Sequence, residues 1–161
     1  MLRDGRAVRL RELGPNDEAE LLQAFDRLGA DERYMRFMAP IREPNVQRLR
    51  AVLASFPQAG SAIGAIVAAP DGIDIAGTAS FMIDGRDCEF AISITDGWAG
   101  AGLGRLLMEA LIDAARARNL ARMHGYVLAT NQPMLRLAAR LGFESAPDPG
   151  DYAVRRVTRD L

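Results

Sequence analysis

Residues 98–105, Trp-Ala-Gly-Ala-Gly-Leu-Gly-Arg, constrain the fold more than any other stretch of the chain. Residues 89–94 before them alternate as a strand does, and apolar residues from 103 to 118 recur at the spacing of a helix. A glycine at every second position lets the backbone approach a ligand closely, and the first N–H groups of a helix have no partner within it. These groups and the helix dipole favour a phosphate. The stretch therefore predicts a strand, an anion-binding loop and a helix in succession.

Two common phosphate-binding motifs do not match this loop. In a dinucleotide-binding motif starting at Gly100, the third glycine would fall on Arg105, and the acidic residue required about twenty positions later is missing from 120–123, Leu-Ala-Arg-Met. A nucleoside triphosphatase loop requires a lysine, and the chain has none, because all 20 of its basic residues are arginine. The loop therefore indicates a different nucleotide-like ligand.

A second motif follows the helix. Residues 131–143, Asn-Gln-Pro-Met-Leu-Arg-Leu-Ala-Ala-Arg-Leu-Gly-Phe, predict a short helix that opens at an asparagine and ends in Leu-Gly-Phe. In this order, the two motifs resemble the pyrophosphate loop and the next motif of the GNAT superfamily of acetyl-CoA-dependent N-acetyltransferases. The resemblance implies an α+β fold, a mixed and mostly antiparallel central sheet with helices on both faces, and acetyl-CoA as co-substrate.

Further stretches extend the resemblance over most of the chain. Residues 28–37, 89–91 and 127–131 are similar to the GNAT domain of bacterial protein lysine acetyltransferases. This likeness implies a primary amine as acceptor, with a protein lysine favoured. Two alternatives stay open: a small-molecule amine as acceptor, and a regulatory module that binds coenzyme A without catalysis. Three side chains of the first stretch could shape the acceptor site: Arg33, Tyr34 and Arg36.

Glu89 is the candidate general base. An amine attacks a thioester only when it is neutral, so an N-acetyltransferase needs a group that removes the proton. On a strand, Glu89 shares one face with the small residues Ala91 and Ser93, which leave room for substrate, while Phe90 and Ile92 face the other side. In the acetyltransferases that the chain resembles, a glutamate at this position is the base. The structural alternative is a solvated glutamate at a strand end.

The resemblance also implies which residues hold acetyl-CoA. The strand before the loop would separate from its neighbour, so that free backbone groups meet the pantetheine arm, and the loop would hold the pyrophosphate. Asn131 is also a suitable N-cap for its helix, and the two roles are compatible. The candidate cofactor-binding residues are Ile92, Ser93, Ile94, Gly100, Ala101, Gly102, Leu103, Gly104, Arg105 and Asn131.

The chain departs from the family pattern at two positions. Ala99 stands where the first motif usually has glutamine or arginine, so backbone donors must carry more of the pyrophosphate binding. Ala138 stands where many members have a tyrosine as general acid. The thiolate would then leave unprotonated, or take a proton from water or from Tyr126. Either route is chemically acceptable, because an ordinary thiol has a pKa of about 8.5.

His124 and Cys88 are the single histidine and cysteine of the chain. His124 lies in the middle of a predicted strand with no serine or aspartate constellation beside it, which indicates a structural role. Cys88 points to the face opposite Glu89, which indicates packing. One histidine and one cysteine cannot build the usual metal clusters, so we expect no metal site.

Composition indicates one domain over residues 1–161, because 49% hydrophobic and 25% charged residues are typical of a globular protein of this length. A net charge of −1 with interspersed signs disfavours nucleic acid and anionic membranes as partners. The longest apolar run, 62–69, is too short to span a membrane, and the first residues hold no apolar signal core. We therefore expect a cytoplasmic protein, either a monomer or a homodimer.

Apolar spacing and turn residues predict the order of the elements. The expected strands are 8–11, 61–69, 73–83, 88–94, 123–129 and 152–158. The expected helices are 15–28, 33–37, 46–56, 103–118 and one that begins at 131.

Overall fold

The structure, a computed structural model, describes residues 2–28, 36, 44–70 and 72–161. A seven-stranded sheet forms its centre. Its strands are β1 (Arg9–Glu12), β2 (Gly60–Ala69), β3 (Gly72–Asp84), β4 (Asp87–Ile94), β5 (Arg122–Leu128), β6 (Glu144–Asp148) and β7 (Asp151–Asp160). They lie in the order β1-β2-β3-β4-β5-β7-β6, and all neighbours are antiparallel except β4 and β5, which are parallel. The predicted mixed, mostly antiparallel sheet is confirmed.

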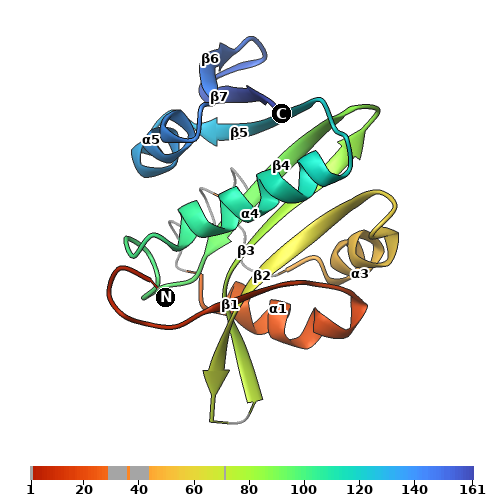
Figure 1. The fold of residues 1–161 in the computed structure, drawn as a ribbon, viewed down its shortest axis with the longest axis vertical. Coiled ribbons are helices and arrows are strands. Elements are labelled where there is room, and N and C mark those ends of the chain that lie inside the picture. Colours follow the sequence, from red (N-terminus) through yellow and green to blue (C-terminus); the bar gives the residue numbers. More distant parts are fainter. Residues whose placement is uncertain (1, 29–35, 37–43, 71) are drawn as a thin grey trace.

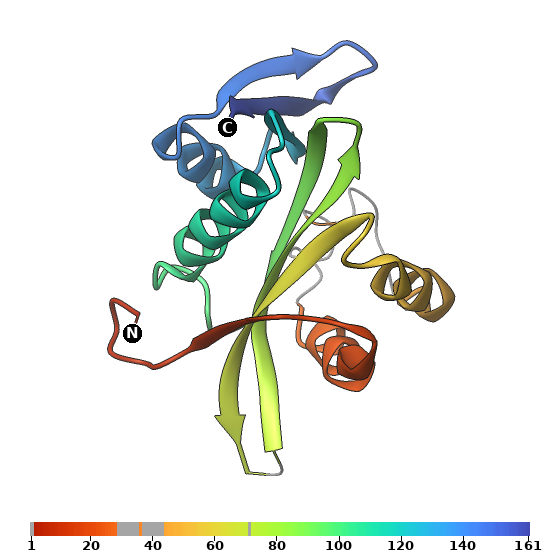
Figure 2. The same cartoon turned by 45° about the vertical axis from the view of Figure 1, so that its right-hand side comes forward.

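Helices cover both faces of this sheet, as predicted (Figure 1, Figure 2). On one face lie α4 (Leu103–Ala117) and α5 (Gln132–Arg140), and on the other lie α1 (Glu18–Asp26) and α3 (Val46–Ser55). A short 3-10 turn, Pro15–Asp17, leads into α1. Within the described part of the chain, no helix is long and apolar enough to cross a membrane.

α4 contributes a large part of the core. One side of this helix is apolar, and Leu107 and Leu111 are fully buried there against β3, as is Phe81 of that strand. α4 ends at Ala117, two residues before Asn119, which the sequence indicates as a stop and which has a left-handed φ of 59°. The N–H groups of Asn119 and Leu120 donate to the carbonyl groups of Arg116 and Ala115, so these two carbonyl groups of the last turn have partners.

β6 is the strand that the sequence does not predict, so the expectation of six strands is wrong by one. Its side chains are exposed or half-buried and show no apolar alternation, and Pro147 interrupts them. Among the described strands, β6 pairs with β7 alone, at the edge of the sheet, where proline is tolerated and little side-chain burial is needed. The predicted helix at 33–37 lies outside the described residues except for Arg36.

The parallel strands β4 and β5 pair over a short distance and then separate. Pairing runs from Asp87 opposite Arg122 to Glu89 opposite His124, and no later rung joins the two strands, although β4 continues to Ile94. Since every backbone donor and acceptor needs a partner, this opening is a place where the edge of β4 can receive a ligand.

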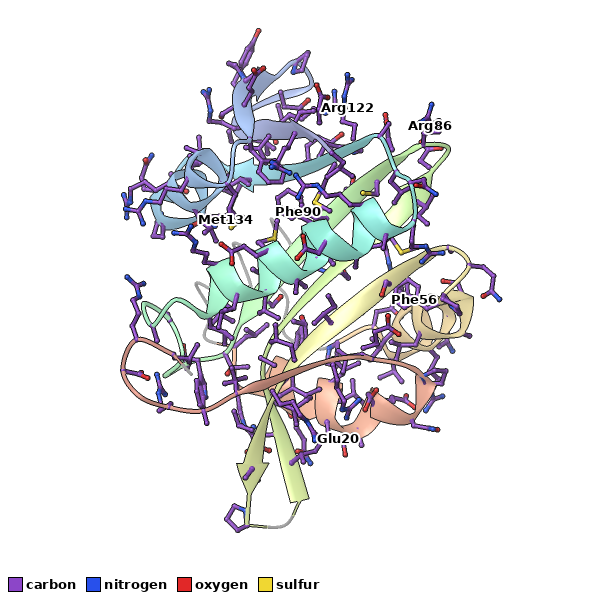
Figure 3. The ribbon with its side chains drawn as sticks, in the orientation of Figure 1. Glu20, Phe56, Arg86, Phe90, Arg122 and Met134 are labelled. Atoms are coloured by element: carbon purple, nitrogen blue, oxygen red, sulfur yellow. The ribbon has the colours of Figure 1, made fainter. Side chains whose placement is uncertain are left out.

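Phe90 fills the start of the opening on the side of α4 and α5 (Figure 3). Its ring occupies space that a side chain at Gly125 of β5 would need, because a Cβ there would lie 2.4 Å from Phe90 Cε1. The ring also meets Phe143 edge to face, with centroids 5.4 Å apart. Phe143 is held there by the end of α5, where Gly142 has a φ of 87° and the Phe143 N–H donates to Ala138.

Candidate active site

A cleft of about 1600 Å³ opens where β4 and β5 separate. Residues of β4, of the loop between β4 and α4, of the N-terminal half of α4 and of α5 along its length line it, together with residues of α1 and α3. All the residues that the sequence predicts for catalysis or cofactor binding line this cleft: Glu89, Ile92, Ser93, Ile94, Gly100, Ala101, Gly102, Leu103, Gly104, Arg105 and Asn131.

β4 presents two different faces, as its alternation predicts. Phe90 packs into the core on the α4 side and borders the cleft from there, whereas Ala91 and Ser93 line the cleft on the same face as Glu89. Beyond Glu89, the edge of β4 toward β5 has no strand partner in the described structure. The backbone at 92–94 is therefore free to bind an extended ligand.

The loop between β4 and α4 needs its glycines for their backbone conformation. Gly100 and Gly102 have φ values of 78° and 91°, in the left-handed region that other residues rarely adopt. Gly102 is the N-cap of α4, and the N–H groups of Leu103, Gly104 and Arg105 donate to no acceptor among the described residues. These groups, with the dipole of α4 behind them, can bind an anion.

Asn131 caps α5, which confirms the structural role expected of it. Its Oδ1 accepts a hydrogen bond from the N–H of Met134, at 3.4 Å. Asn131 also lines the cleft, so capping does not remove it from the site. Arg105 lies on the first turn of α4, where its guanidinium pairs with Glu109 at 2.8 Å.

Glu89 lies at the last paired position between β4 and β5, opposite His124. The Glu89 side chain is 53% exposed, and its Oε1 lies 3.7 Å from Nε2 of His124, whose side chain is 14% exposed. The His124 ring stands edge-on to Tyr126, with centroids 5.8 Å apart. Nδ1 of His124 is buried and has no hydrogen-bond partner among the described residues. The sequence has no signal for this contact, because it depends on which strand lies beside β4.

Arg36 and Arg48 line the cleft, and the charges of Arg48 and Glu89 both act on the Arg36 guanidinium. Burial lowers the pKa of the Arg36 guanidinium below its ordinary value, the charge of Arg48 lowers it further, and the charge of Glu89 opposes both effects. A guanidinium remains charged at neutral pH despite such a shift. Arg36 thus lines the cleft, and its role in shaping an acceptor site stays a prediction, whereas Arg33 and Tyr34 lie outside the described residues.

The described tyrosines differ in their position relative to the cleft. Ala138, at the position where a tyrosine acid is common, is buried with 1% of its surface exposed. Tyr126 is 39% exposed and lines the cleft, whereas Tyr152 is 84% exposed and lies outside it. Tyr34 is not among the described residues. Of the tyrosines that are described, Tyr126 is therefore the one that can reach a ligand in the cleft.

Cys88 is fully buried on the face of β4 opposite Glu89. Burial raises the pKa of its thiol to about 11, and the charge of Asp87 adds to the effect. The Sγ atom lies 3.6 Å from the carbonyl oxygen of Arg122. A buried thiol with a raised pKa is a poor nucleophile. The geometry agrees with the packing role expected from the sequence.

Four arginines of the cleft are not identified from the sequence as cofactor-binding residues. Arg136 and Arg140 stand one turn apart on α5, a spacing that could have identified them as one face of the second motif. Arg3 and Arg48 come from segments far from the motifs along the chain, and no local pattern indicates them.

Comparisons with known proteins agree on one family. A family model described as the acetyltransferase (GNAT) domain matches residues 7–144. The acetyltransferase PA5475 of Pseudomonas aeruginosa is 34% identical over 154 residues, which cover 93% of this chain and 82% of that protein.

Solved structures share the fold. The GNAT domain of S. lividans PAT superposes with a TM-score of 0.89 at 22% identity, over 99% of this chain and 94% of that one. The PaiA N-acetyltransferase of Thermoplasma acidophilum, solved in complex with coenzyme A, has a TM-score of 0.77 at 12% identity, over 97% of this chain and 100% of that one. With a matched family model and a relative above 30% identity, the chain belongs to the GNAT family of acetyl-CoA-dependent acetyltransferases.

Proposed function

We propose that this protein transfers the acetyl group of acetyl-CoA to a primary amine, with Glu89 as general base and a protein lysine as the favoured acceptor. One observation carries the proposal: the carboxylate of Glu89, the unpaired edge of β4 and the free N–H groups of α4 all line a single cleft. Each element supplies a different requirement of the reaction, namely a base, a place for the pantetheine arm and a place for phosphate.

The proposed orientation of acetyl-CoA follows from these positions. The pyrophosphate would lie at Gly100–Arg105, against the N–H groups of Leu103 and Gly104. The pantetheine arm would pair with the open edge of β4 at 92–94, which brings the thioester toward Glu89. Asn131, at the start of α5, would contact the cofactor from the other wall of the cleft.

The chemistry then requires few groups. The neutral amine forms an N–C bond to the acetyl carbon, the C–S bond breaks, and the electron pair of that bond leaves with the sulfur. Glu89 accepts the proton that the amine loses, either directly or through water. Its half-exposed carboxylate can return this proton to solvent, so the base is regenerated after each transfer.

Two similarities support a protein lysine as the acceptor. The stretches around 28–37 and 127–131 resemble protein lysine acetyltransferases, and the fold agrees over almost the whole chain with the GNAT domain of S. lividans PAT. Arg48 supports a second candidate acceptor, a small amine that also carries a carboxylate or phosphate, because its guanidinium group lines the same cleft and can attract an anion. For either acceptor, nearby positive charge lowers the pKa of the amine and so favours its neutral, nucleophilic form.

The decisive experiment measures release of free thiol from acetyl-CoA with three kinds of acceptor: a lysine-containing protein extract, amino acids and simple amines. Acetyl transfer to protein would support the lysine acceptor, and turnover with an amino acid alone would support the small-molecule candidate. Because the chain contains no lysine, acetyl-lysine detected in the reaction belongs to the acceptor.

Glu89→Gln should lower kcat by about 10² or more at neutral pH with little change in affinity for acetyl-CoA, as expected for loss of a general base. Activity should recover in part at higher pH, where more of the amine is already neutral. Glu144→Gln, at an exposed glutamate of β6 outside the cleft, is the matched control. If the protein binds coenzyme A but releases no thiol with any acceptor, the proposal of an enzyme is wrong and the alternative of a regulatory module is supported.

A further inference from the structure

The segment 2–6 lies against the loop between β4 and α4, although more than ninety residues separate them along the chain (Figure 1, Figure 2). The N–H of Arg3 donates to the carbonyl of Ala101 at 3.2 Å. Nη1 of Arg6 donates to the carbonyl of Gly97 at 2.8 Å, and its guanidinium lies 3.9 Å from the centre of the Trp98 ring. Both ends of the loop are therefore fixed by this segment.

The two arginines of the segment have different surroundings. Arg6 forms an ion pair with Asp4 at 2.6 Å, in addition to its contacts with the loop, so its charge is already balanced. Arg3 has no carboxylate within ion-pair distance among the described residues, and its guanidinium makes one long hydrogen bond, 3.4 Å, to the carbonyl of Gly100. Arg6 holds the loop, whereas Arg3 retains an unneutralised charge beside it.

The Arg3 side chain lies directly over the N-cap of α4. A Cβ added to Gly102 would lie 3.1 Å from Arg3 Nε, and the free N–H groups of 103–105 begin at the next residue. Arg3 lines the cleft at this point. The cation that the loop itself provides, Arg105, is paired with Glu109 at 2.8 Å, and Ala99 has no polar side chain.

We propose that Arg3 binds the pyrophosphate of acetyl-CoA from the N-terminal segment and supplies the cationic contact that Ala99 cannot make. This inference rests on the proposed placement of the pyrophosphate and adds to it a residue outside both motifs. It adds a charged side chain to the backbone donors that are expected to carry more of the binding, because a guanidinium and a phosphate attract each other as opposite charges and can form a charge-assisted hydrogen bond.

The test compares a ligand that contains the pyrophosphate with one that lacks it. Arg3→Ala should weaken binding of coenzyme A about tenfold in calorimetry and leave binding of pantetheine unchanged. The loss should shrink at high salt, because the side chain is exposed, and Arg3→Lys should recover part of it. Arg9→Ala, at an exposed arginine of β1 outside the cleft, is the matched control.

Two results would overturn the inference. If Arg3→Ala binds coenzyme A with unchanged affinity, Arg3 does not bind the pyrophosphate. Equal weakening of coenzyme A and pantetheine would show that Arg3 acts only by holding the loop. Failure of the wild-type protein to bind coenzyme A would instead contradict the proposed function, so the two failures are distinguishable.

Discussion

The carboxylate of Glu89 and the imidazole of His124 face each other across the last rung between β4 and β5, with Oε1 3.7 Å from Nε2. This distance is longer than a hydrogen bond, and the side chain of Glu89 is half exposed. An interaction of this kind contributes about 1 kcal/mol or less. His124 therefore lies where it can orient the proposed base, but only weakly.

His124→Phe, which preserves a ring beside Tyr126, should lower kcat by at most about fivefold and leave the KM for acetyl-CoA unchanged. His124→Gln, which restores a polar group, should recover part of the loss. A fall of about 10² with an altered pH–rate profile would instead show that His124 itself transfers the proton.

The sequence predicts the parts of the site that are local. The glycines at 100 and 102 predict a loop that leads into a helix, and an asparagine before Pro133 predicts a helix cap, because each signal acts within a few residues. The face that carries Glu89 follows from the period of a strand alone. These features are present in the structure where they are expected.

The contacts that the sequence does not predict are those between distant segments. His124 reaches Glu89 because β5 adds beside β4, and Arg3 reaches Gly100 because the N-terminal segment crosses the loop. β6 lacks an apolar pattern because it is an exposed edge strand. Periodicity and caps contain no information about such neighbours, so the structure is needed to find them.

Gly125 should be intolerant of any side chain. A Cβ would lie 2.4 Å from Phe90 Cε1, and that ring cannot retreat easily because it is buried and packs against Phe143. Gly125→Ala should therefore lower the free energy of unfolding by about 1 to 3 kcal/mol in urea denaturation, as overpacked cores do. Gly150→Ala, where only Asp148 comes within 3.9 Å, should change it little.

Gly102→Val should abolish binding of coenzyme A while the protein remains folded. Valine at a φ of 91° costs about 1 to 2 kcal/mol, which favours a changed loop conformation, and its Cβ would lie 3.1 Å from Arg3 Nε, so the Arg3 side chain must move as well. Calorimetry with coenzyme A measures the loss. Gly85→Val, at a φ of 65° in the turn before β4, carries similar strain outside the cleft and should bind normally. Normal affinity of Gly102→Val would contradict the placement of the pyrophosphate.

Asp17 should make the stability of the protein depend on pH in the acid range. Two hydrogen bonds from Arg11, at 2.9 and 3.1 Å, and one from the N–H of Gly14 hold the pKa of this buried carboxyl below its ordinary value. A lowered pKa in the folded state stabilises the protein above the unfolded pKa, about 3.9. This stabilisation is lost as the pH falls through the lower, folded pKa.

Asp17→Asn should therefore be less stable than the wild-type protein by about 1 to 3 kcal/mol at pH 7, because charged hydrogen bonds to Arg11 are lost. The difference should persist down to about pH 4 and shrink below it. Thermal unfolding measured from pH 7 to pH 2 checks this. A constant difference through the acid range would show that the charge of Asp17 does not stabilise the fold.

Substitution of Tyr126 tests whether the reaction needs a general acid. Ala138 leaves α5 without a tyrosine, and Tyr126 is the described tyrosine that lines the cleft. Because a thiol has a pKa of about 8.5, its thiolate can leave near neutral pH with little help. We expect Tyr126→Phe to lower kcat less than about tenfold, similar to the exposed control Tyr152→Phe, and the pH–rate profile to rise to a plateau. A loss of about 10² with acetyl-CoA binding preserved, and a falling alkaline limb that disappears in the variant, would assign the acid to Tyr126.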